Sequence, residues 1–190
     1  AIGAVAQASP VALTVKAGAG FFALPLDCRI HEGAVFSDRD SRTLLDRMVD
    51  LAFSLGVDRP ALLVADAYYA SAKVIKPLLA KGWHLVTAAR SNAVAYRTPD
   101  PHPRGNRGRP RLSGEKVILR DLFKDESVFT EAESVVYGEK GVIIRFHSVD
   151  LLWRPVGIPV RFVLAMHPTR GKRILLSTDL SLPPLEIIRL

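Results

Sequence analysis

The sequence lacks cysteine pairs, long apolar runs and an initiating methionine. Cys28 is the only cysteine among the 190 residues, which excludes an internal disulfide framework and a cysteine zinc site and favours a reducing compartment. No apolar run approaches about 18 residues, so a membrane-spanning helix is not predicted. The chain starts at Ala1 without a methionine or a signal-like segment, and we therefore expect it to be a fragment of a longer protein.

The sequence has fewer acidic than basic side chains. The chain has 19 Asp and Glu against 26 Lys and Arg, for a formal charge of +7 and a pI near 9.9. This balance favours a polyanionic partner such as nucleic acid. Residues 97–120 hold seven basic and two acidic side chains and so supply five of the seven excess charges. The basic character is therefore local.

The segment Pro101–Arg111 lies inside this basic region. It has almost no side chain that could build a core, so we expect an exposed, flexible loop. Its run Arg107-Gly108-Arg109-Pro110-Arg111 is similar to the core of an AT-hook, an extended segment that lies in a narrow minor groove. Three interpretations stay open: general phosphate contact, minor-groove recognition and a merely solvated loop. The candidate DNA contacts in this loop are Arg104, Arg107, Arg109 and Arg111.

The first 96 residues alternate between strand and helix patterns. Two β-rich runs separated by a glycine-containing turn predict an antiparallel pair at the start of a sheet, and the later segments predict helices between parallel strands. With 48% hydrophobic residues, this order predicts a mixed α/β domain. The predicted strands are Ala1–Ala17 with an interruption at Ser9-Pro10, Phe21–Ile30, Ala61–Val64 and Trp83–Ala89; the predicted helices are Leu44–Leu55, with an N-cap among Ser37–Ser41, and Ser71–Lys81.

Asp66 is the candidate catalytic residue of this half. It follows the apolar run Ala61–Val64, which predicts a strand buried on both faces. The carboxyl end of such a strand is where ligands and catalytic groups collect in open α/β sheets. Asp66 is either a cap of the helix that follows or a metal-binding carboxylate. This stretch alone does not decide between the two.

Short strand patterns dominate the chain after Lys116. Trp153 lies between two of these strands and is either a core anchor or a side chain that stacks on a DNA base. His147 and His167 lack nearby cysteine and are poor zinc candidates. The predicted strands span residues 117–119, 134–137, 142–147, 160–167 and 173–178, and a final helix begins at Leu185.

Six motifs occur in an order that spans nearly the whole chain. They are Phe21-Phe22-Ala23-Leu24-Pro25-Leu26, Arg29-Ile30-His31-Glu32-Gly33, Val64-Ala65-Asp66-Ala67-Tyr68-Tyr69-Ala70, Arg90-Ser91-Asn92-Ala93-Val94-Ala95-Tyr96, Arg107-Gly108-Arg109-Pro110-Arg111 and Pro183-Pro184-Leu185-Glu186-Ile187-Ile188-Arg189-Leu190. Together they resemble the central part of a DDE transposase of bacterial insertion sequences. The resemblance implies an RNase H-like catalytic core interrupted by a β-rich insertion. It also implies that Asp66 is the second of three catalytic carboxylates, which hold two divalent ions, Mg²⁺ or Mn²⁺, for phosphodiester cleavage and strand transfer.

The chain departs from the pattern of that family at the other two carboxylates. The resemblance implies a first Asp on a strand before Ala1 and a Glu in a Tyr-x2-Arg-x3-Glu-x6-Lys helix after Leu190, and neither is present. Asp27 and Glu186 are poor substitutes, because Asp27 lies on an otherwise apolar strand and Glu186 has no Tyr and Arg at the motif spacing. A single carboxylate holds Mg²⁺ weakly. We therefore expect a catalytically incomplete piece of a transposase, with an exposed sheet edge.

Three functions stay open on this sequence. The first is a transposase endonuclease domain, the second is a DNA-binding remnant without catalysis, and the third is another RNase H-like nuclease such as a resolvase or an exonuclease. The predicted DNA contacts are Arg90, Arg104, Arg107, Arg109, Arg111 and Trp153. The predicted partners are DNA, as transposon ends and target, and further copies of the chain in a dimer or larger assembly. No membrane partner is predicted, and the expected location is the cytoplasm, on the nucleoid.

The predicted fold is α/β, an RNase H-like mixed sheet with helices that is interrupted by a β-rich insertion. Residues 1–96 are expected to form the partial catalytic core. Residues 97–180 are expected to form the basic loop and the insertion, and residues 181–190 the start of a truncated core helix.

Overall fold

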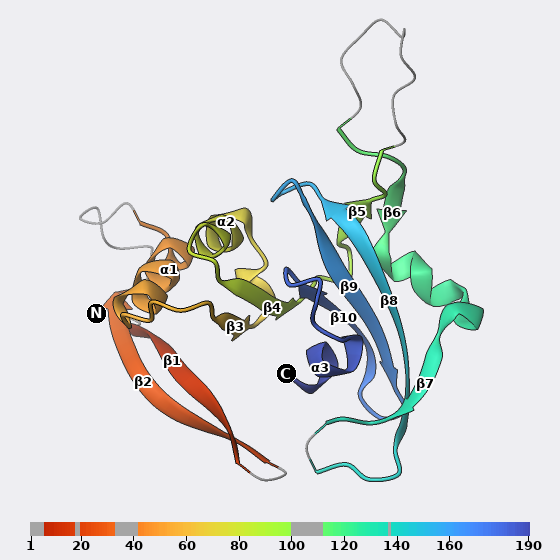
Figure 1. Ribbon diagram of the computed structural model, residues 1–190, viewed down its shortest axis with the longest axis horizontal. Helices are drawn as coiled ribbons and strands as arrows, with labels where there is room; N and C mark the ends of the chain where they lie inside the picture. Colours follow the sequence, from red (N-terminus) through yellow and green to blue (C-terminus); the bar gives the residue numbers. More distant parts are fainter. Residues whose placement is uncertain (1–5, 18–19, 33–41, 100–111, 137) are drawn as a thin grey trace, which may run out of the picture.

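The structure is a computed structural model that describes residues 6–17, 20–32, 42–99, 112–136 and 138–190. These residues form a two-stranded sheet and an eight-stranded mixed sheet, with helices packed against them (Figure 1). The mixed α/β content is therefore confirmed, while the RNase H-like assignment and the division into a core and an insertion stay predictions. Within these ranges, no helix is long and apolar enough to cross a membrane.

The two-stranded sheet is the predicted antiparallel hairpin. Strand β1 (Ala6–Ala17) pairs with β2 (Gly20–Glu32), and a register shift occurs between Val11 and Ala12. The expectation that this pair begins the main sheet is wrong for the described residues, because the two strands pair only with each other. Val11 packs on the first helix, so side chains rather than backbone hydrogen bonds join the hairpin to the rest.

The main sheet runs in the order β3-β4-β10-β9-β8-β5-β6, and β7 pairs with β8 beside this path. Its first two strands are parallel, as predicted, and its other pairings are antiparallel. The strands are β3 (Leu62–Ala65), β4 (His84–Ala88), β5 (Val94–Tyr96), β6 (Lys116–Ile118), β7 (Thr130–Glu133), β8 (Ile143–Trp153), β9 (Ile158–His167) and β10 (Gly171–Ser177). The predicted strand at 134–137 is wrong: β7 lies just before it, and the Ser134 hydroxyl instead donates to Glu139 in the following turn.

Three α-helices and three short 3-10 segments complete the fold. The helix predicted at Leu44–Leu55 is confirmed, but its cap is Thr43, whose side chain and Asp46 form a reciprocal capping box. The predicted caps at 37–41 lie outside the described residues. The α-helices are α1 (Leu44–Ser54), α2 (Ala72–Ala80) and α3 (Pro184–Arg189), and the 3-10 segments are η1 (Ala67–Tyr69), η2 (Leu119–Lys124) and η3 (Glu126–Val128).

Helices cover the two faces of the main sheet unequally. Neighbouring residues of a strand point to opposite faces, so Leu85 joins the core under α1 and α2, whereas Val86 packs with Ile187 of α3. The larger core includes the fully buried Phe162, and among the described residues α3 is the one helix that packs on the far face. Figure 1 shows α1 and α2 together on one side of β3 and β4, with α3 on the other.

Strand β3 forms one edge of the main sheet. The prediction that it is buried on both faces is wrong, because Leu62 and Val64 are 37% and 43% exposed while Leu63 packs on the core. In the described residues β3 pairs with β4 alone, and α3 lies over β9 and β10 rather than over β3. The apolar run indicated a strand correctly, but its outer face and outer edge have no cover there.

Candidate functional site

Asp66 lies immediately after β3, at the carboxyl end of the parallel pair β3–β4. Its backbone is extended, with φ −75° and ψ 175°, and its Oδ1 accepts a hydrogen bond of 2.8 Å from the amide of Tyr68. The capping interpretation is therefore confirmed, with the short η1 as the capped segment. Within the described part of the chain, the second carboxylate oxygen accepts no hydrogen bond, and the side chain is exposed. That oxygen is available to a ligand.

A buried hydroxyl holds the backbone of Asp66 in place. The Oγ1 of Thr87, on the neighbouring strand β4, donates to the Asp66 carbonyl oxygen at 2.6 Å. Thr87 is 2% exposed, so this bond is protected from water. The Asp66 main chain is thus fixed on both sides, by strand pairing before it and by the Thr87 bond at its own carbonyl. Such anchoring orients a carboxylate without covering it.

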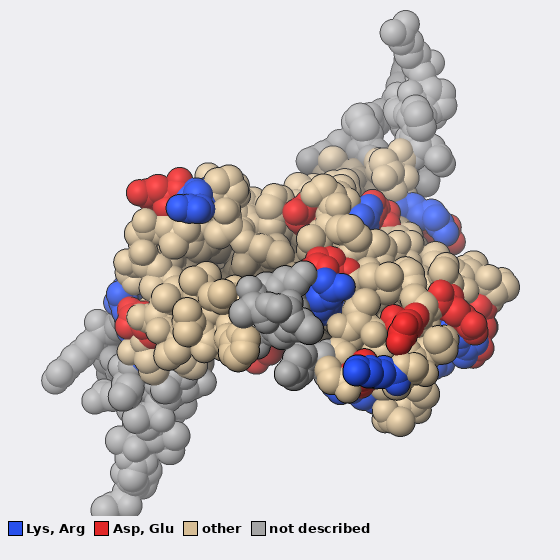
Figure 2. All heavy atoms as spheres, turned by 60° about the horizontal axis from the view of Figure 1, so that its bottom comes forward, with Lys and Arg blue, Asp and Glu red and all other residues tan. Residues whose placement is uncertain are grey.

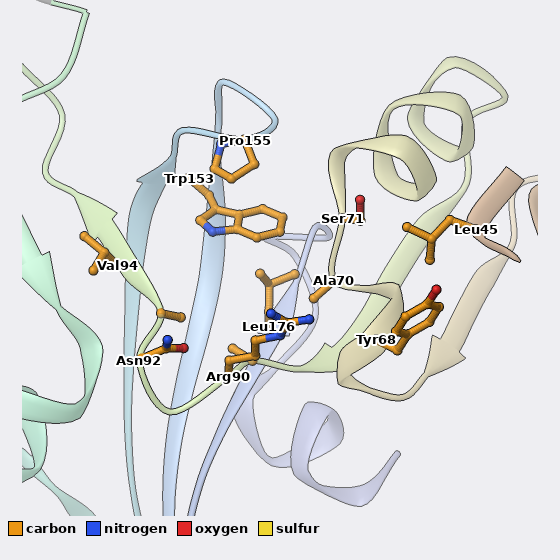
Figure 3. A pocket seen from close by; sticks show the side chains of 12 residues that line it. Leu45, Tyr68, Ala70, Ser71, Arg90, Asn92, Val94, Trp153, Pro155 and Leu176 are labelled. Carbon is orange, nitrogen blue, oxygen red and sulfur yellow. The ribbon is translucent and has the colours of Figure 1, made fainter. Parts of the chain in front are cut away.

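A cavity of about 420 Å³ adjoins this segment (Figure 3). Tyr68 and Leu45 stand on one side of it and Trp153 and Pro155 on another, and Arg90 and Asn92 lie below Trp153 in this view. Its walls are mainly apolar, and the guanidinium of Arg90 is the one charged group that the described residues contribute to it. The residues that line it are Leu45, Tyr68, Ala70, Ser71, Ala89, Arg90, Asn92, Ala93, Val94, Trp153, Pro155 and Leu176.

The structure thus brings together two of the predicted DNA contacts, Arg90 and Trp153. Arg90 is exposed in the turn after β4, where the amide of Ala93 donates to its carbonyl at 2.9 Å. Trp153, at the end of β8, is 8% exposed and belongs to the main core, as its core-anchor interpretation expected. One edge of its ring also borders the cavity, so burial in the core and a contact with a ligand are compatible there.

The loop arginines Arg104, Arg107, Arg109 and Arg111 lie outside the described residues. The described ends of that loop are joined, because the amide of Arg97 donates to the carbonyl of Glu115 at 2.9 Å and that of Gly114 donates to Arg97 at 2.9 Å. A side chain at position 114 would meet the Thr98 carbonyl oxygen at 2.7 Å, so the close approach requires glycine. The loop connects β5 to β6.

The described residues supply an incomplete ligand set for a divalent ion. Nowhere among them do three or more His, Cys, Asp or Glu side chains gather to hold a metal. Asp27 lies on the separate hairpin, 3.8 Å from Arg29, and Glu186 pairs with Arg189 at 3.0 Å on the α3 side of the sheet. Mg²⁺ needs several oxygen ligands. Asp66 fits as one ligand, and this part of the chain does not build a two-metal site.

Sequence reasoning missed which residues share a cavity with the segment that follows Asp66. Tyr68 and Ser71 follow Asp66 closely in the chain, and Asn92 lies two residues after Arg90; all four line the same cavity. Their positions in the sequence could have predicted this, because polar residues that follow the carboxyl ends of two adjacent parallel strands meet at one edge of the sheet. Trp153 comes from a distant strand, and no local pattern places it there.

Comparison with known proteins adds the family. Residues 27–136 match the model of a protein family described as DDE superfamily endonuclease, which covers more than half of the chain. The chain belongs to the DDE superfamily of endonucleases. No curated protein matches it. The matched region of this DDE domain contains Asp66, Arg90 and the arginine loop, and it ends before Trp153. The resemblance to DDE transposases is thereby confirmed at the level of a transposase-like domain, and the family implies a DNA substrate.

Proposed function

We propose that this chain is part of the catalytic domain of an insertion-sequence DDE transposase, which cleaves phosphodiester bonds and transfers DNA strands with Mg²⁺ or Mn²⁺. Asp66 is the residue that we assign to metal binding. The observation that carries the proposal is its position: within the region matched to the DDE family, it is an exposed carboxylate at the carboxyl end of a parallel strand.

Asp66 is suited to this role by its anchoring. The Thr87 hydroxyl and the Tyr68 amide fix its carbonyl oxygen and its Oδ1, and within the described residues Oδ2 accepts no hydrogen bond and is free to bind a ligand. A bound divalent ion would neutralise charge on the scissile phosphate and activate the attacking oxygen. The described residues supply only one carboxylate to the proposed metal site, that of Asp66. We therefore expect the chain alone to bind the ion weakly and not to cleave DNA.

DNA is the proposed partner. Arg90 offers a cation in the cavity that adjoins the segment after Asp66, and Trp153 offers a ring edge in the same cavity, where an unstacked base would find an apolar wall. We assign Arg104, Arg107, Arg109 and Arg111 to contacts with the phosphate backbone. We also propose that copies of the protein assemble on DNA as a dimer or larger complex, in the cytoplasm and on the nucleoid.

The test is cleavage by the full-length gene product with Mg²⁺, in wild-type form and with Asp66→Asn. Asp58→Asn is the matched control, since Asp58 is also exposed and lies before β3. We expect Asp66→Asn to abolish nicking and strand joining and Asp58→Asn to leave both unchanged. Cleavage that persists in Asp66→Asn would refute the assignment. Nicking without strand joining would favour another nuclease, and DNA binding without nicking would favour a binding-only protein.

A further inference from the structure

A second cavity, of about 490 Å³, lies at the same end of β4 and shares Ala89 with the first. It is formed where four segments meet: the chain just after β3, the end of β4 with the residues that follow it, the first half of β10, and η2. Its lining residues include Ala67, which directly follows Asp66, and Ala88, which directly follows Thr87. The cavity therefore adjoins the backbone that directly follows Asp66, the proposed catalytic residue.

Among the described residues, four basic side chains line this cavity and no acidic one does. They are Arg120, Lys124, Lys172 and Arg173. Three of them have no carboxylate partner in the described part of the chain. Lys124 pairs with Asp121 at 2.9 Å, and the two side chains are 77% and 41% exposed. An exposed pair of this kind contributes little and is easily exchanged for another anion.

On the face shown in Figure 2, by contrast, basic and acidic side chains are interspersed. Elsewhere in the described residues basic side chains pair with carboxylates, as Arg145 does with Glu126 at 2.6 Å. Gathering like charges around one hollow costs electrostatic energy unless an anion compensates for it. The ammonium of Lys172 lies 5.2 Å from the centre of the Phe123 ring, which holds it at the cavity wall.

We propose that this cavity binds the phosphate backbone of the DNA strand that passes Asp66. Arg120, Lys172 and Arg173 are then positioning residues, because they hold the strand and do not touch the reacting atoms. The proposal rests on the proposed function, since it takes DNA as the substrate. Guanidinium and ammonium groups around a hollow suit phosphate oxygens, and such contacts set the register of the strand without reading its bases.

The experiment measures binding of a short labelled duplex and a short labelled single strand to the chain by fluorescence anisotropy. It is done in EDTA over a range of salt concentrations. The test variant is the double substitution Arg120→Gln with Arg173→Gln. The control is Lys76→Gln with Lys140→Gln, which removes the same charge from two exposed lysines that line neither cavity. Because all four positions are exposed, we expect every variant to fold, and circular dichroism checks this.

We expect the test variant to bind DNA roughly tenfold more weakly than the wild type, and the control to differ from it by about twofold or less. The slope of log affinity against log salt should fall by about 1.8 in the test variant, or 0.9 for each lost phosphate contact. Equal effects of the two double substitutions would overturn the inference. So would a wild-type chain that does not bind either DNA in EDTA.

Failure of this inference can be told from failure of the proposed function. Binding in EDTA does not depend on a metal, so it reports on the cavity and not on Asp66. If the cavity variant binds like the control while Asp66→Asn abolishes cleavage, the inference is wrong and the proposed function stands. If Asp66→Asn cleaves normally while the cavity variant loses affinity, the metal role is wrong and the cavity remains a DNA site.

Discussion

The hydroxyl of Thr87 donates a hydrogen bond of 2.6 Å to the backbone carbonyl oxygen of Asp66. This bond crosses between two adjacent parallel strands at the edge of the sheet where both cavities lie. It links a buried side chain of the core to the main chain of the exposed carboxylate. The stability of the sheet and the orientation of the proposed metal ligand therefore depend on the same bond.

The first prediction concerns this bond. Thr87→Val keeps the shape of the side chain and removes its donor, which leaves the Asp66 carbonyl without that partner. We expect the free energy of unfolding to fall by about 1–2 kcal/mol, measured by urea denaturation. In the full-length protein, we expect Thr87→Val to slow cleavage without weakening DNA binding in EDTA. Thr87→Ser, which keeps the hydroxyl, should preserve the cleavage rate; slowing in both variants alike would contradict the positioning role.

The second prediction concerns acid stability. The Glu139 carboxylate accepts from Ser134 at 2.5 Å, contacts His167 Nε2 at 2.8 Å and pairs with Arg170 at 2.9 Å. Hydrogen bonds from Ser134 and then His167 lower the pKa of Glu139 from 4.5 to about 2. Because the folded pKa is the lower one, the stabilisation is fully present above about pH 4.5 and is lost as the pH falls towards 2.

We expect Glu139→Gln to lower the stability at neutral pH and to flatten its decline between about pH 4.5 and 2, followed by urea denaturation at each pH. The matched control is Glu131→Gln, an exposed position on β7. A wild-type curve and a Glu139→Gln curve that run parallel through this window would show that Glu139 does not supply the acid dependence.

The third prediction concerns the start of α1. The Thr43 amide donates to the Asp46 carboxylate at 2.8 Å, and the Asp46 amide donates to the Thr43 hydroxyl at 3.4 Å. Thr43→Ala removes the side-chain half of this capping box and should cost about 1 kcal/mol in the free energy of unfolding. Thr43→Ser keeps the hydroxyl and should retain most of the stabilisation by the capping box. An alanine variant as stable as the wild type would mean that another group caps the helix.

The fourth prediction separates the two roles of Trp153. Because its ring is part of the main core, Trp153→Ala should lower the free energy of unfolding by about 3–5 kcal/mol. Trp153→Phe keeps an aromatic surface, so we expect a smaller loss of stability and nearly unchanged binding of single-stranded DNA. If the phenylalanine variant is stable but binds the strand much more weakly, the indole ring itself contacts DNA. Urea denaturation and anisotropy measure the two effects separately.

Local patterns in the sequence determined which segments form helices and strands. The 3.6-residue spacing of apolar side chains predicts α1 and α2 because each helix buries a single stripe. Apolar β-branched runs likewise predict β4, β9 and β10. Asp66 is identified as a candidate catalytic residue because it follows a predicted strand, and the basic region is identified by counting charges. These are properties of neighbouring residues, so they can be read without knowing the fold.

Only the tertiary structure decided what each element packs against. The apolar run of β3 indicates a strand but not that this strand is a sheet edge with Leu62 exposed. Two strand patterns joined by a turn predict the β1–β2 hairpin, but they do not reveal that this hairpin forms a sheet separate from the main one. The basic cavity joins Arg120 to Arg173, which lie far apart in the chain. Each strand or helix could pack against many partners, and the arrangement that forms is the one that buries the most apolar area in total. That total depends on the whole chain, so it cannot be read from any local stretch of the sequence.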